Sequence, residues 1–273
     1  MTVRAGVAGW PIAHSLSPVI HGAWIRAAGL DAVYTACGPE TEDRFAALVD
    51  QLRHGAIRGL NVTAPYKEIA LRLADQASDT ARACGSANLL WQDGSVLRAD
   101  STDGRGLMIA LAEQAPDMDP AGRSALVLGA GGAARAAVHA LGQVFDEVRL
   151  LNRTPARADA LIAAVQPHTA ARLIRSAGPG EAVRSAGLIV NALSVPPDLD
   201  MDGIEPGTVL MDMRYRPLMT GFLQAGRDRG HTVVDGLAML IGQARPSFET
   251  LFGRAPPDVD VRAEALRVLG AQT

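Results

Sequence analysis

A glycine-rich turn between a buried strand and a helix is the feature that most constrains this fold. The apolar residues 125–128 are followed at once by Gly129-Ala130-Gly131-Gly132-Ala133-Ala134 and then by an alanine-rich stretch. The pattern G-x-G-x-x-A in this setting is typical of a dinucleotide-binding strand–turn–helix unit. Gly129 would make the tight turn, Gly131 would let backbone amides approach a pyrophosphate, and Ala134 would let the helix pack closely. The alternative is a glycine-rich turn without a ligand.

The end of the following strand indicates which dinucleotide binds. Asn152-Arg153-Thr154 follow the strand expected at 148–151, and Arg157 lies one turn further. An NAD site usually has a carboxylate at this place, which accepts hydrogen bonds from the ribose, and this chain has none there. Arg153 can instead pair with a 2′-phosphate, a charge-assisted contact worth about 1.5–3 kcal/mol. We therefore expect NADP rather than NAD, with a solvated loop arginine as the alternative.

Two successive runs of alternating strands and helices predict two α/β units in series. In the first run, Ser17 is expected to cap a helix that ends at Gly29, with Pro18 in its first turn. A short helix is expected from Pro65, and a hairpin at 87–99 is expected to turn at Asp93-Gly94 in type I′ geometry. The remaining strands are expected at 3–8, 32–36, 59–62, 125–128, 148–151, 188–190, 209–212 and 232–234, and the further helices at about 41–53 and 107–115.

The composition excludes several classes of protein. The 26 Lys and Arg residues nearly balance the 29 Asp and Glu residues, and only 4% of residues are aromatic. Neither a basic groove nor a stacking platform for nucleic acid is therefore supported. The longest stretch without charged residues, 5–25, is broken by proline, serine and histidine, which argues against a membrane span or a signal peptide. The two cysteines and six histidines lack metal-like spacing, so we expect a cytoplasmic globular protein without a metal site.

Polar side chains gather where expected loops leave strands and enter helices, which is where open α/β sheets bind ligands. Ser15 and Ser17 would place two hydroxyls at a helix N-terminus, a suitable cradle for a carboxylate. Ser17 and Thr63 could instead be simple helix caps, and Asn88 could be a turn residue. Because short hydroxyl and amide side chains dominate, the ligand they suit is a small polyhydroxylated acid.

Lys67 and Asp103 are the one plausible acid–base pair among these clusters. An alcohol that loses hydride to a nicotinamide must also lose a proton, so Lys67 could serve as the base. Asp103 would orient the ammonium group or the substrate hydroxyl. An ordinary surface salt bridge is the alternative.

Several motifs, in one order along nearly the whole chain, resemble those of the shikimate dehydrogenase family. They are Gly9-Trp10-Pro11-Ile12-Ala13-His14-Ser15-Leu16-Ser17-Pro18, Asn61-Val62-Thr63 with Pro65 and Lys67-Glu68, the Asn88 segment, Thr102-Asp103-Gly104, Gly129–Ala133, Asn152-Arg153-Thr154, Asp212-Met213-Arg214-Tyr215, and Asp235-Gly236 with Met239-Leu240 and Gln243. The resemblance implies reversible, NADP-dependent reduction of 3-dehydroshikimate to shikimate, a step in chorismate and aromatic amino-acid biosynthesis.

The resemblance also implies a domain plan. Residues 1–103 and 237–273 would form an α/β substrate-binding and catalytic domain, and residues 104–236 a Rossmann-like NADP domain. The final helices, from near Leu237, would return to the first domain, and the two domains would flank a cleft that can close.

Residue roles follow from the same resemblance. Ser15 and Ser17 would hold the substrate carboxylate, and Lys67 and Asp103 would be catalytic. The residues that would help to hold the substrate are Thr63, Asn88, Tyr215 and Gln243. Those that would bind NADP are Gly129, Ala130, Gly131, Gly132, Ala133, Asn152, Arg153, Thr154 and Arg157, with Met213 and Gly236 bordering the nicotinamide mainly through backbone groups.

Four departures from the family pattern leave the substrate open. Ser101 stands where the family usually has Asn, Ala87 where it usually has Val, and Gly221 where it usually has Pro. The loop after Asn191-Ala192, Leu193-Ser194-Val195-Pro196-Pro197, is shorter than usual. The alternatives are a paralogue that acts on quinate or another shikimate analogue, an NAD-dependent quinate/shikimate enzyme, or a non-catalytic ligand sensor. A monomer or homodimer is expected.

Overall fold

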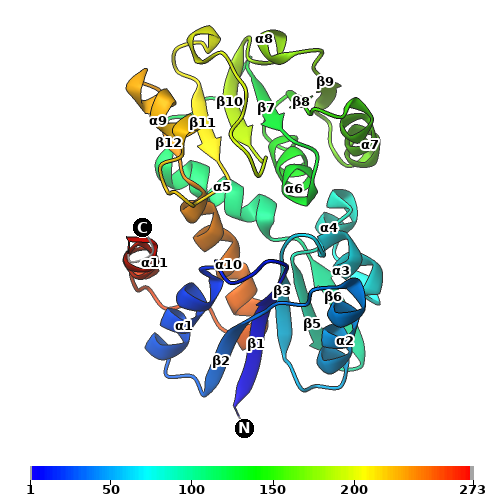
Figure 1. The fold of residues 1–273 in the computed structure, drawn as a ribbon. Coiled ribbons are helices and arrows are strands. Elements are labelled where there is room, and N and C mark those ends of the chain that lie inside the picture. The colour runs from blue at the N-terminus through cyan, green and yellow to red at the C-terminus, as the bar shows by residue number, and fades with distance from the viewer. Residues whose placement is uncertain (1, 271–273) are drawn as a thin grey trace. The chain divides into compact units, whose positions relative to one another are not determined.

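The computed structural model describes residues 2–270, which form two compact units (Figure 1). Unit 1 contains residues 2–102 and 243–270, and unit 2 contains residues 103–242. Each unit has its own six-stranded sheet with helices packed on it, so the predicted α/β class is confirmed. The division into a substrate domain and an NADP domain stays a prediction.

Unit 1 is built on a mixed sheet in the order β2-β1-β3-β5-β6-β4. The first three strands of the chain, β1 (Val3–Ala8), β2 (Ala32–Cys37) and β3 (Gly59–Val62), are parallel. Antiparallel β5 (Leu89–Asp93) and β6 (Val96–Asp100) continue the sheet, and the two-residue β4 (Gln76–Ala77) ends it. Because β5 runs against β3, the start of β5 lies beside the end of β3.

Helices cover both faces of this sheet (Figure 1). On one face, α2 (Glu42–Arg53) and α3 (Lys67–Leu73) contribute Phe45, Leu52 and Ala70 to an apolar cluster with the strands. On the other face, α1 (Ser17–Ala27) and the part of α10 (Gly236–Phe252) from Gln243 on enclose an aromatic group. The short α4 (Asp79–Cys84) precedes β5, and α11 (Val261–Gly270) packs on α1, where Arg26 pairs with Glu264 at 2.7 Å.

Unit 2 has a wholly parallel sheet in the order β12-β11-β10-β7-β8-β9. Its strands are β7 (Ser124–Leu128), β8 (Glu147–Leu151), β9 (Arg172–Arg175), β10 (Ala186–Asn191), β11 (Val209–Asp212) and β12 (Val233–Val234). The chain builds outward from β7 in one direction and then in the other, so the topology reverses between β7 and β10. Ligands of open parallel sheets bind at such a switch point.

Burial on both faces explains why the strands of unit 2 are continuous apolar runs. Ala125 and Val127 of β7 face a cluster that includes α5 (Asp103–Gln114), α6 (Gly132–Leu141) and α7 (Pro155–Val165). Leu126 and Leu128 face the opposite cluster, which includes α8 (Pro179–Ala182) and α9 (Gly221–Asp228). Two 3₁₀ turns, Gln166–His168 and Met201–Gly203, complete the unit.

Three local predictions were wrong. The hairpin turns at Gly94-Ser95, because Asp93 pairs with Val96, and only Gly94 has a positive φ (+60°), which fits type II′ rather than I′. Ser17 lies inside the first turn of α1 instead of capping it, and Leu16 occupies the N-cap position. The helix expected from Pro65 begins at Lys67, with Tyr66 at its N-cap.

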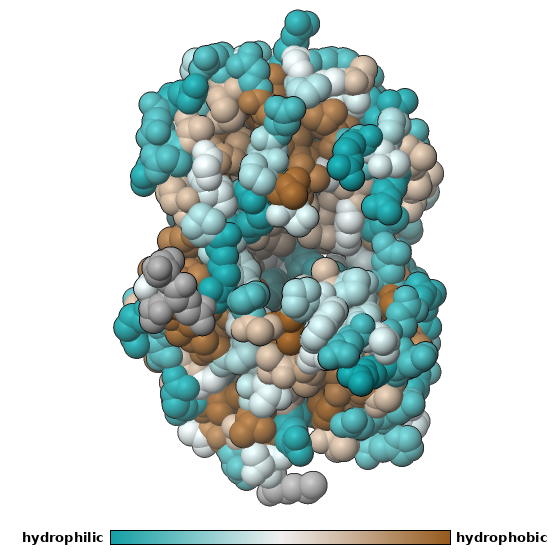
Figure 2. Space-filling model, viewed as in Figure 1, coloured by the Kyte–Doolittle hydropathy of each residue, from teal (hydrophilic) through white to brown (hydrophobic). Residues whose placement is uncertain are grey.

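A helix that crosses a bilayer must be long and predominantly apolar. No helix within residues 2–270 combines the length and apolar character needed to cross a bilayer. In the view of Figure 2, hydrophilic side chains cover much of both units, and apolar side chains show in separate areas.

A buried histidine in unit 1 predicts a pH dependence of stability. His21 is fully buried, its ring stacks on Tyr34 at 4.0 Å between centroids, and neither ring nitrogen has a hydrogen-bond partner among the described residues. Burial lowers the pKa of His21 from 6.5 to about 3. Because the unfolded chain then binds more protons than the folded one between these pH values, the free energy of unfolding should fall with falling pH. The slope should approach about 1.4 kcal/mol per pH unit.

His21→Phe keeps an aromatic ring and should flatten this part of the profile, measured by urea unfolding between pH 4.5 and 7. The exposed His54 provides the matched control, His54→Gln, which should leave the slope as in the wild type. An unchanged slope in His21→Phe would contradict the assignment.

Candidate functional site

Four segments of unit 1 that carry predicted site residues meet at one edge of its sheet. The segments after β1 and β3 leave the carboxyl ends of parallel strands, and these ends share an edge. The segments before β5 and after β6 reach the same edge, because Leu89 pairs with both Asn61 and Asp100. The edge therefore gathers Ser15, Thr63, Asn88 and Thr102, although up to 87 residues of chain separate them.

A buried network of amide and hydroxyl groups fixes this edge. Asn88 Nδ2 donates to Thr102 Oγ1 at 2.9 Å and to Gln243 Oε1 at 3.2 Å, and Asn88 Oδ1 accepts from the Thr102 amide at 2.7 Å. The Thr102 hydroxyl also reaches the Gln243 carbonyl at 3.1 Å. All three residues are buried. The structure thus brings together Asn88 and Gln243, two of the predicted substrate ligands.

The network extends to three residues that the sequence analysis did not assign to the site. Asn61 Nδ2 donates to Ser247 Oγ at 2.9 Å, and Ser247 Oγ donates to the Gln243 carbonyl at 3.1 Å. Tyr34 donates its phenolic proton to Asn61 Oδ1 at 2.7 Å, and burial raises the pKa of Tyr34 well above its usual range, so the donor stays protonated. Ser247 lies one helical turn after Gln243, and this i, i+4 spacing was the available signal.

Lys67 is the first residue of α3 and is half-buried. Its carbonyl accepts the Ala87 amide at 2.9 Å, which ties the start of α3 to the residue before Asn88. The composition held a further signal, because Lys67 is the one lysine among the 26 Lys and Arg residues. Arginine cannot be deprotonated in proteins, and Lys67 carries the single side-chain amine of the chain.

Asp103 follows Thr102 directly and is the first residue of α5, in unit 2. Its side chain is buried. Because Asn88 Oδ1 accepts the Thr102 amide, the backbone of unit 1 is fixed up to Thr102, the residue before Asp103.

The serines after β1 take different places from those expected. Ser15 Oγ, rather than Ser17 Oγ, accepts an amide of the first helical turn, that of Ser17 at 3.3 Å. Ser17 is only 4% exposed, whereas Ser15 is half-buried. Thr63 is no cap of α3, because that helix begins four residues later.

In unit 2, the glycine-rich turn has the backbone that its sequence predicts. Gly129 has a φ of +112°, a region that residues with a side chain rarely adopt. Ala134, in the first turn of α6, is fully buried in the core. A Cβ at Gly131 would meet nothing within 4 Å, so the space before α6 is open. The N-terminus of α6 has no side-chain cap, which leaves its amides available to an anion. These features fit a dinucleotide pyrophosphate.

The end of β8 lies beside this turn, because the Gly129 amide donates to the Leu151 carbonyl at 2.9 Å. Asn152 follows and donates from Nδ2 to the Thr154 carbonyl at 2.9 Å, which shapes the loop into α7. Arg153 and Arg157 are both exposed. Two exposed guanidinium groups in the segment that follows β8 fit a second phosphate.

The last predicted cofactor residues lie in close backbone contact. A Cβ at Gly236 would stand 2.4 Å from the Met213 carbonyl oxygen and 2.6 Å from that of Arg214. The start of α10 therefore needs glycine to approach the segment after β11. Met213 and Tyr215 of that segment are half-buried.

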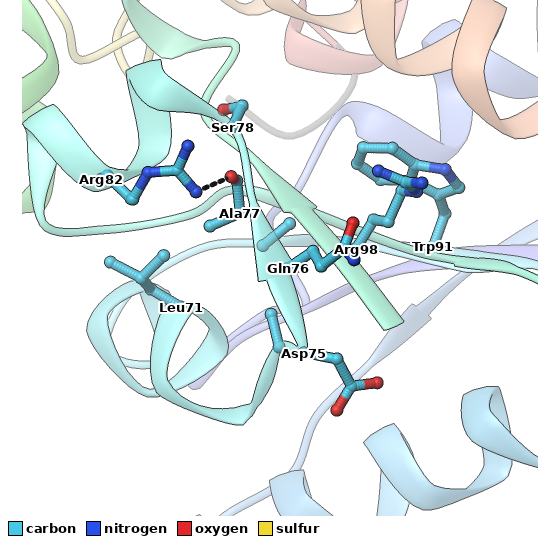
Figure 3. A pocket seen from close by; sticks show the side chains of 10 residues that line it. Leu71, Asp75, Gln76, Ala77, Ser78, Arg82, Trp91 and Arg98 are labelled. Carbon is cyan, nitrogen blue, oxygen red and sulfur yellow. Dashed lines mark hydrogen bonds between the residues drawn. The ribbon is translucent and has the colours of Figure 1, made fainter. Parts of the chain in front are cut away.

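A separate cavity of about 590 Å³ lies beside β4 and β6 in unit 1, and its lining is drawn in Figure 3. Its charged groups already have partners: Arg98 pairs with Asp93, Asp75 with Arg53, and Arg82 with Asp79 and the Ala77 carbonyl. No predicted site residue lines it. Among residues 2–270, no group of three His, Cys, Asp or Glu side chains could hold a metal ion.

Comparison with known proteins decides the family. Residues 7–90 match the model of the shikimate dehydrogenase substrate binding domain. A protein of Caulobacter vibrioides strain NA1000 / CB15N, named shikimate dehydrogenase (NADP(+)), is 50% identical over 98% of this chain and 96% of its own length. The chain belongs to the shikimate dehydrogenase family. The resemblance stated from the motifs is confirmed.

Further members agree over nearly the full length. The shikimate dehydrogenase (NADP(+)) of Maricaulis maris strain MCS10 is 45% identical over 98% of this chain and 97% of its own. The crystal structure of shikimate 5-dehydrogenase from Thermus thermophilus, in complex with NADP(H) and shikimate, is 34% identical with a TM-score of 0.85. That alignment covers 97% of this chain and 99% of the other.

The contact at Gly236 predicts a cost of adding one methyl group to this shikimate dehydrogenase family member. Gly236→Ala should lower the free energy of unfolding by about 1–3 kcal/mol, because the new Cβ meets backbone atoms that cannot swing away. Gly221→Ala, at the start of α9, is the control, since a Cβ there meets nothing within 4 Å. Chemical denaturation of both variants measures the difference, and equal stability would refute the contact.

Proposed function

We propose that the chain catalyses the reversible, NADP-dependent reduction of 3-dehydroshikimate to shikimate, with Lys67 and Asp103 as the acid–base pair. The observation that carries this proposal is the buried network of Asn88, Thr102 and Gln243 at the sheet edge of unit 1. It presents short amide and hydroxyl groups in fixed directions, which suits a ligand with several hydroxyl groups. Family membership, at up to 50% identity, supports the same reaction.

The proton transfer belongs to Lys67. When shikimate is oxidised, its reacting hydroxyl loses a proton to the Lys67 amine, and in the reverse direction the Lys67 ammonium returns a proton to the carbonyl oxygen. Asp103 orients the ammonium or the substrate hydroxyl. Bound NADPH supplies the hydride for reduction, and NADP⁺ accepts it in oxidation.

The remaining predicted residues bind the substrate. Ser15 and Ser17, at the start of α1, hold the carboxylate, where the helix N-terminus adds partial positive charge. Thr63, Asn88, Tyr215 and Gln243 bind the hydroxyl groups. Asn88 and Gln243 already bind each other, so their side chains lose little conformational entropy when the substrate binds.

The cofactor residues lie in unit 2. The backbone of Gly129, Ala130, Gly131, Gly132 and Ala133, with the uncapped start of α6, binds the pyrophosphate. Asn152, Arg153, Thr154 and Arg157 bind the 2′-phosphate of the adenosine ribose. Met213 and Gly236 border the nicotinamide.

Two of the departures from the family pattern, Ala87 and Ser101, directly precede residues of the network in the sequence. Ser101 is buried and donates its amide to Asp100 Oδ1 at 2.8 Å, and Ala87 donates its amide to Lys67. Leu193 of the shortened loop reaches the glycine turn, because a Cβ at Gly129 would stand 3.2 Å from Leu193 Cδ2. Quinate or another shikimate analogue is the second candidate substrate, since the chain differs from the family pattern at Ala87, Ser101, Gly221 and this loop.

We further propose a cytoplasmic monomer or homodimer that binds no nucleic acid. The two cysteines without disulfide spacing support a cytoplasmic location, and the net charge of −3 argues against nucleic-acid binding.

Initial rates with shikimate and quinate, each with NADP and with NAD, test the function as a whole. Turnover with shikimate and NADP alone is the expected result. Calorimetric binding without turnover would indicate a sensor, and preference for quinate would indicate a paralogue.

Replacing Lys67 tests the base. Lys67→Ala and Lys67→Arg should both lower kcat by about 10²–10⁴-fold, because neither side chain can take up a proton near neutral pH. Arg72→Ala, an exposed change on the same helix, should leave kcat close to that of the wild type. Near-normal turnover in Lys67→Arg, with circular dichroism like that of the wild type, would exclude Lys67 as the base.

Replacing Arg153 tests the choice of nucleotide. Arg153→Ala should raise the KM for NADPH by about 10–100-fold, as expected for one lost charge-assisted contact, and should leave the KM for NADH nearly unchanged. Arg175→Ala is the control, an exposed arginine that pairs with Asp159 in the same unit. Equal effects of Arg153→Ala on both coenzymes would show that this side chain does not read the 2′-phosphate.

A further inference from the structure

We propose that the buried carboxylate of Asp212 is a positioning group for catalysis: through Arg214 and Thr220 it fixes the segment that presents Met213 and Tyr215. This inference rests on the proposed function, because the roles of Met213 and Tyr215 belong to it. All the residues concerned lie in unit 2.

The Asp212 carboxylate is fully buried and closes a loop between β11 and α9. Oδ1 accepts the Arg214 amide at 3.0 Å and Arg214 Nε at 3.2 Å, while Oδ2 accepts Arg214 Nη2 at 2.9 Å. Oδ2 also accepts the Thr220 hydroxyl at 2.8 Å. One carboxylate thus binds both the start and the end of segment 213–220.

Each end of this loop is anchored to a regular element. The Met213 amide donates to the Asn191 carbonyl at 3.0 Å, at the end of β10. Thr220 Oγ1 accepts the Leu223 amide at 3.4 Å and so caps α9. The carboxylate joins these two anchors, although Asp212 and Thr220 are eight positions apart, and Tyr215 lies between them.

The charge balance explains why Arg214 is needed. A buried carboxylate is costly unless it is paired and hydrogen-bonded, and the two-pronged guanidinium supplies both conditions. Lysine could not supply the same two-pronged contact. Because the Arg214 guanidinium and amide are both held by Asp212, the direction of the backbone from Arg214 to Tyr215 is fixed.

The carboxylate acts through Tyr215 rather than on a ligand. Its two oxygens are used by groups of its own loop, and it has no exposed surface. The carbonyls of Met213 and Arg214, in the same segment, lie close to Gly236. A shift of this segment would therefore move Met213 and Tyr215 together.

Hydrogen exchange of the backbone amides in 213–219 measures the fixation directly. In Arg214→Ala, exchange should be about tenfold faster or more than in the wild type, because the segment opens locally without global unfolding. Thr220→Val should act in the same direction, and Thr220→Ser, which keeps the hydroxyl, should restore slow exchange. The control is Arg229→Ala, which removes an exposed Arg–Asp pair with Asp202 at 2.7 Å in the same unit.

A double-mutant cycle connects the fixation with catalysis. Arg214→Ala should lower kcat/KM for shikimate by about 10–100-fold, mainly through KM, when Tyr215 is present. In a chain that also carries Tyr215→Phe, Arg214→Ala should lower kcat/KM for shikimate by less than about threefold. The Tyr215 hydroxyl, which is the substrate-binding group that Arg214 helps to position, is then already absent. If Arg214→Ala acted only through a general loss of stability, the fold-reductions in kcat/KM of the two single variants would multiply in the double variant.

Two results would overturn the proposal: exchange in Arg214→Ala equal to that in Arg229→Ala, or full multiplicativity with Tyr215→Phe. A wild-type chain that does not turn over shikimate would refute the proposed function instead. The exchange comparison would then still decide whether the carboxylate fixes the segment.

Discussion

The side-chain amide of Asn88 is the group on which the site in unit 1 depends. Its nitrogen and oxygen together bind the Thr102 hydroxyl, the Thr102 amide and Gln243, so one side chain joins the start of β5, the end of β6 and α10. Because all these groups are buried, moving any of them would leave another without a partner, at a cost of about 1–3 kcal/mol. The network therefore holds one arrangement of these three residues.

Unit 2 reaches the same rigidity by close backbone approach. Gly129 lets the turn after β7 lie against Leu193, and Gly236 lets the start of α10 lie against the Met213 carbonyl. The Met213 amide in turn bonds to Asn191 at the end of β10. Because these two glycines have no side chain, the segments after β7, β10 and β11 can come together at the switch point of the sheet, where ligands of such folds bind.

Local sequence patterns predicted most strands and helices, because the spacing of apolar residues in a segment reflects which of its faces is buried. The apolar run 125–128 became β7 and the glycine-rich pattern after it became the turn into α6. The failures were of another kind. Asp93-Gly94 has the composition of a type I′ turn, but the pairing of Asp93 with Val96 moves the turn by one residue. The two-residue β4 exists only because β6 is beside it.

The sequence by itself determined the chemical inventory: the glycine turn, the absence of a carboxylate after β8, Arg153 and a single lysine. These follow from residue type and spacing, which are local. Only the tertiary structure decided which polar groups share hydrogen bonds, such as Asn61 with Ser247 across 186 positions, or Asp212 with Thr220 across a loop. Hydrogen bonds act over about 3 Å in space, and strand order, which no local pattern encodes, sets which residues come that close.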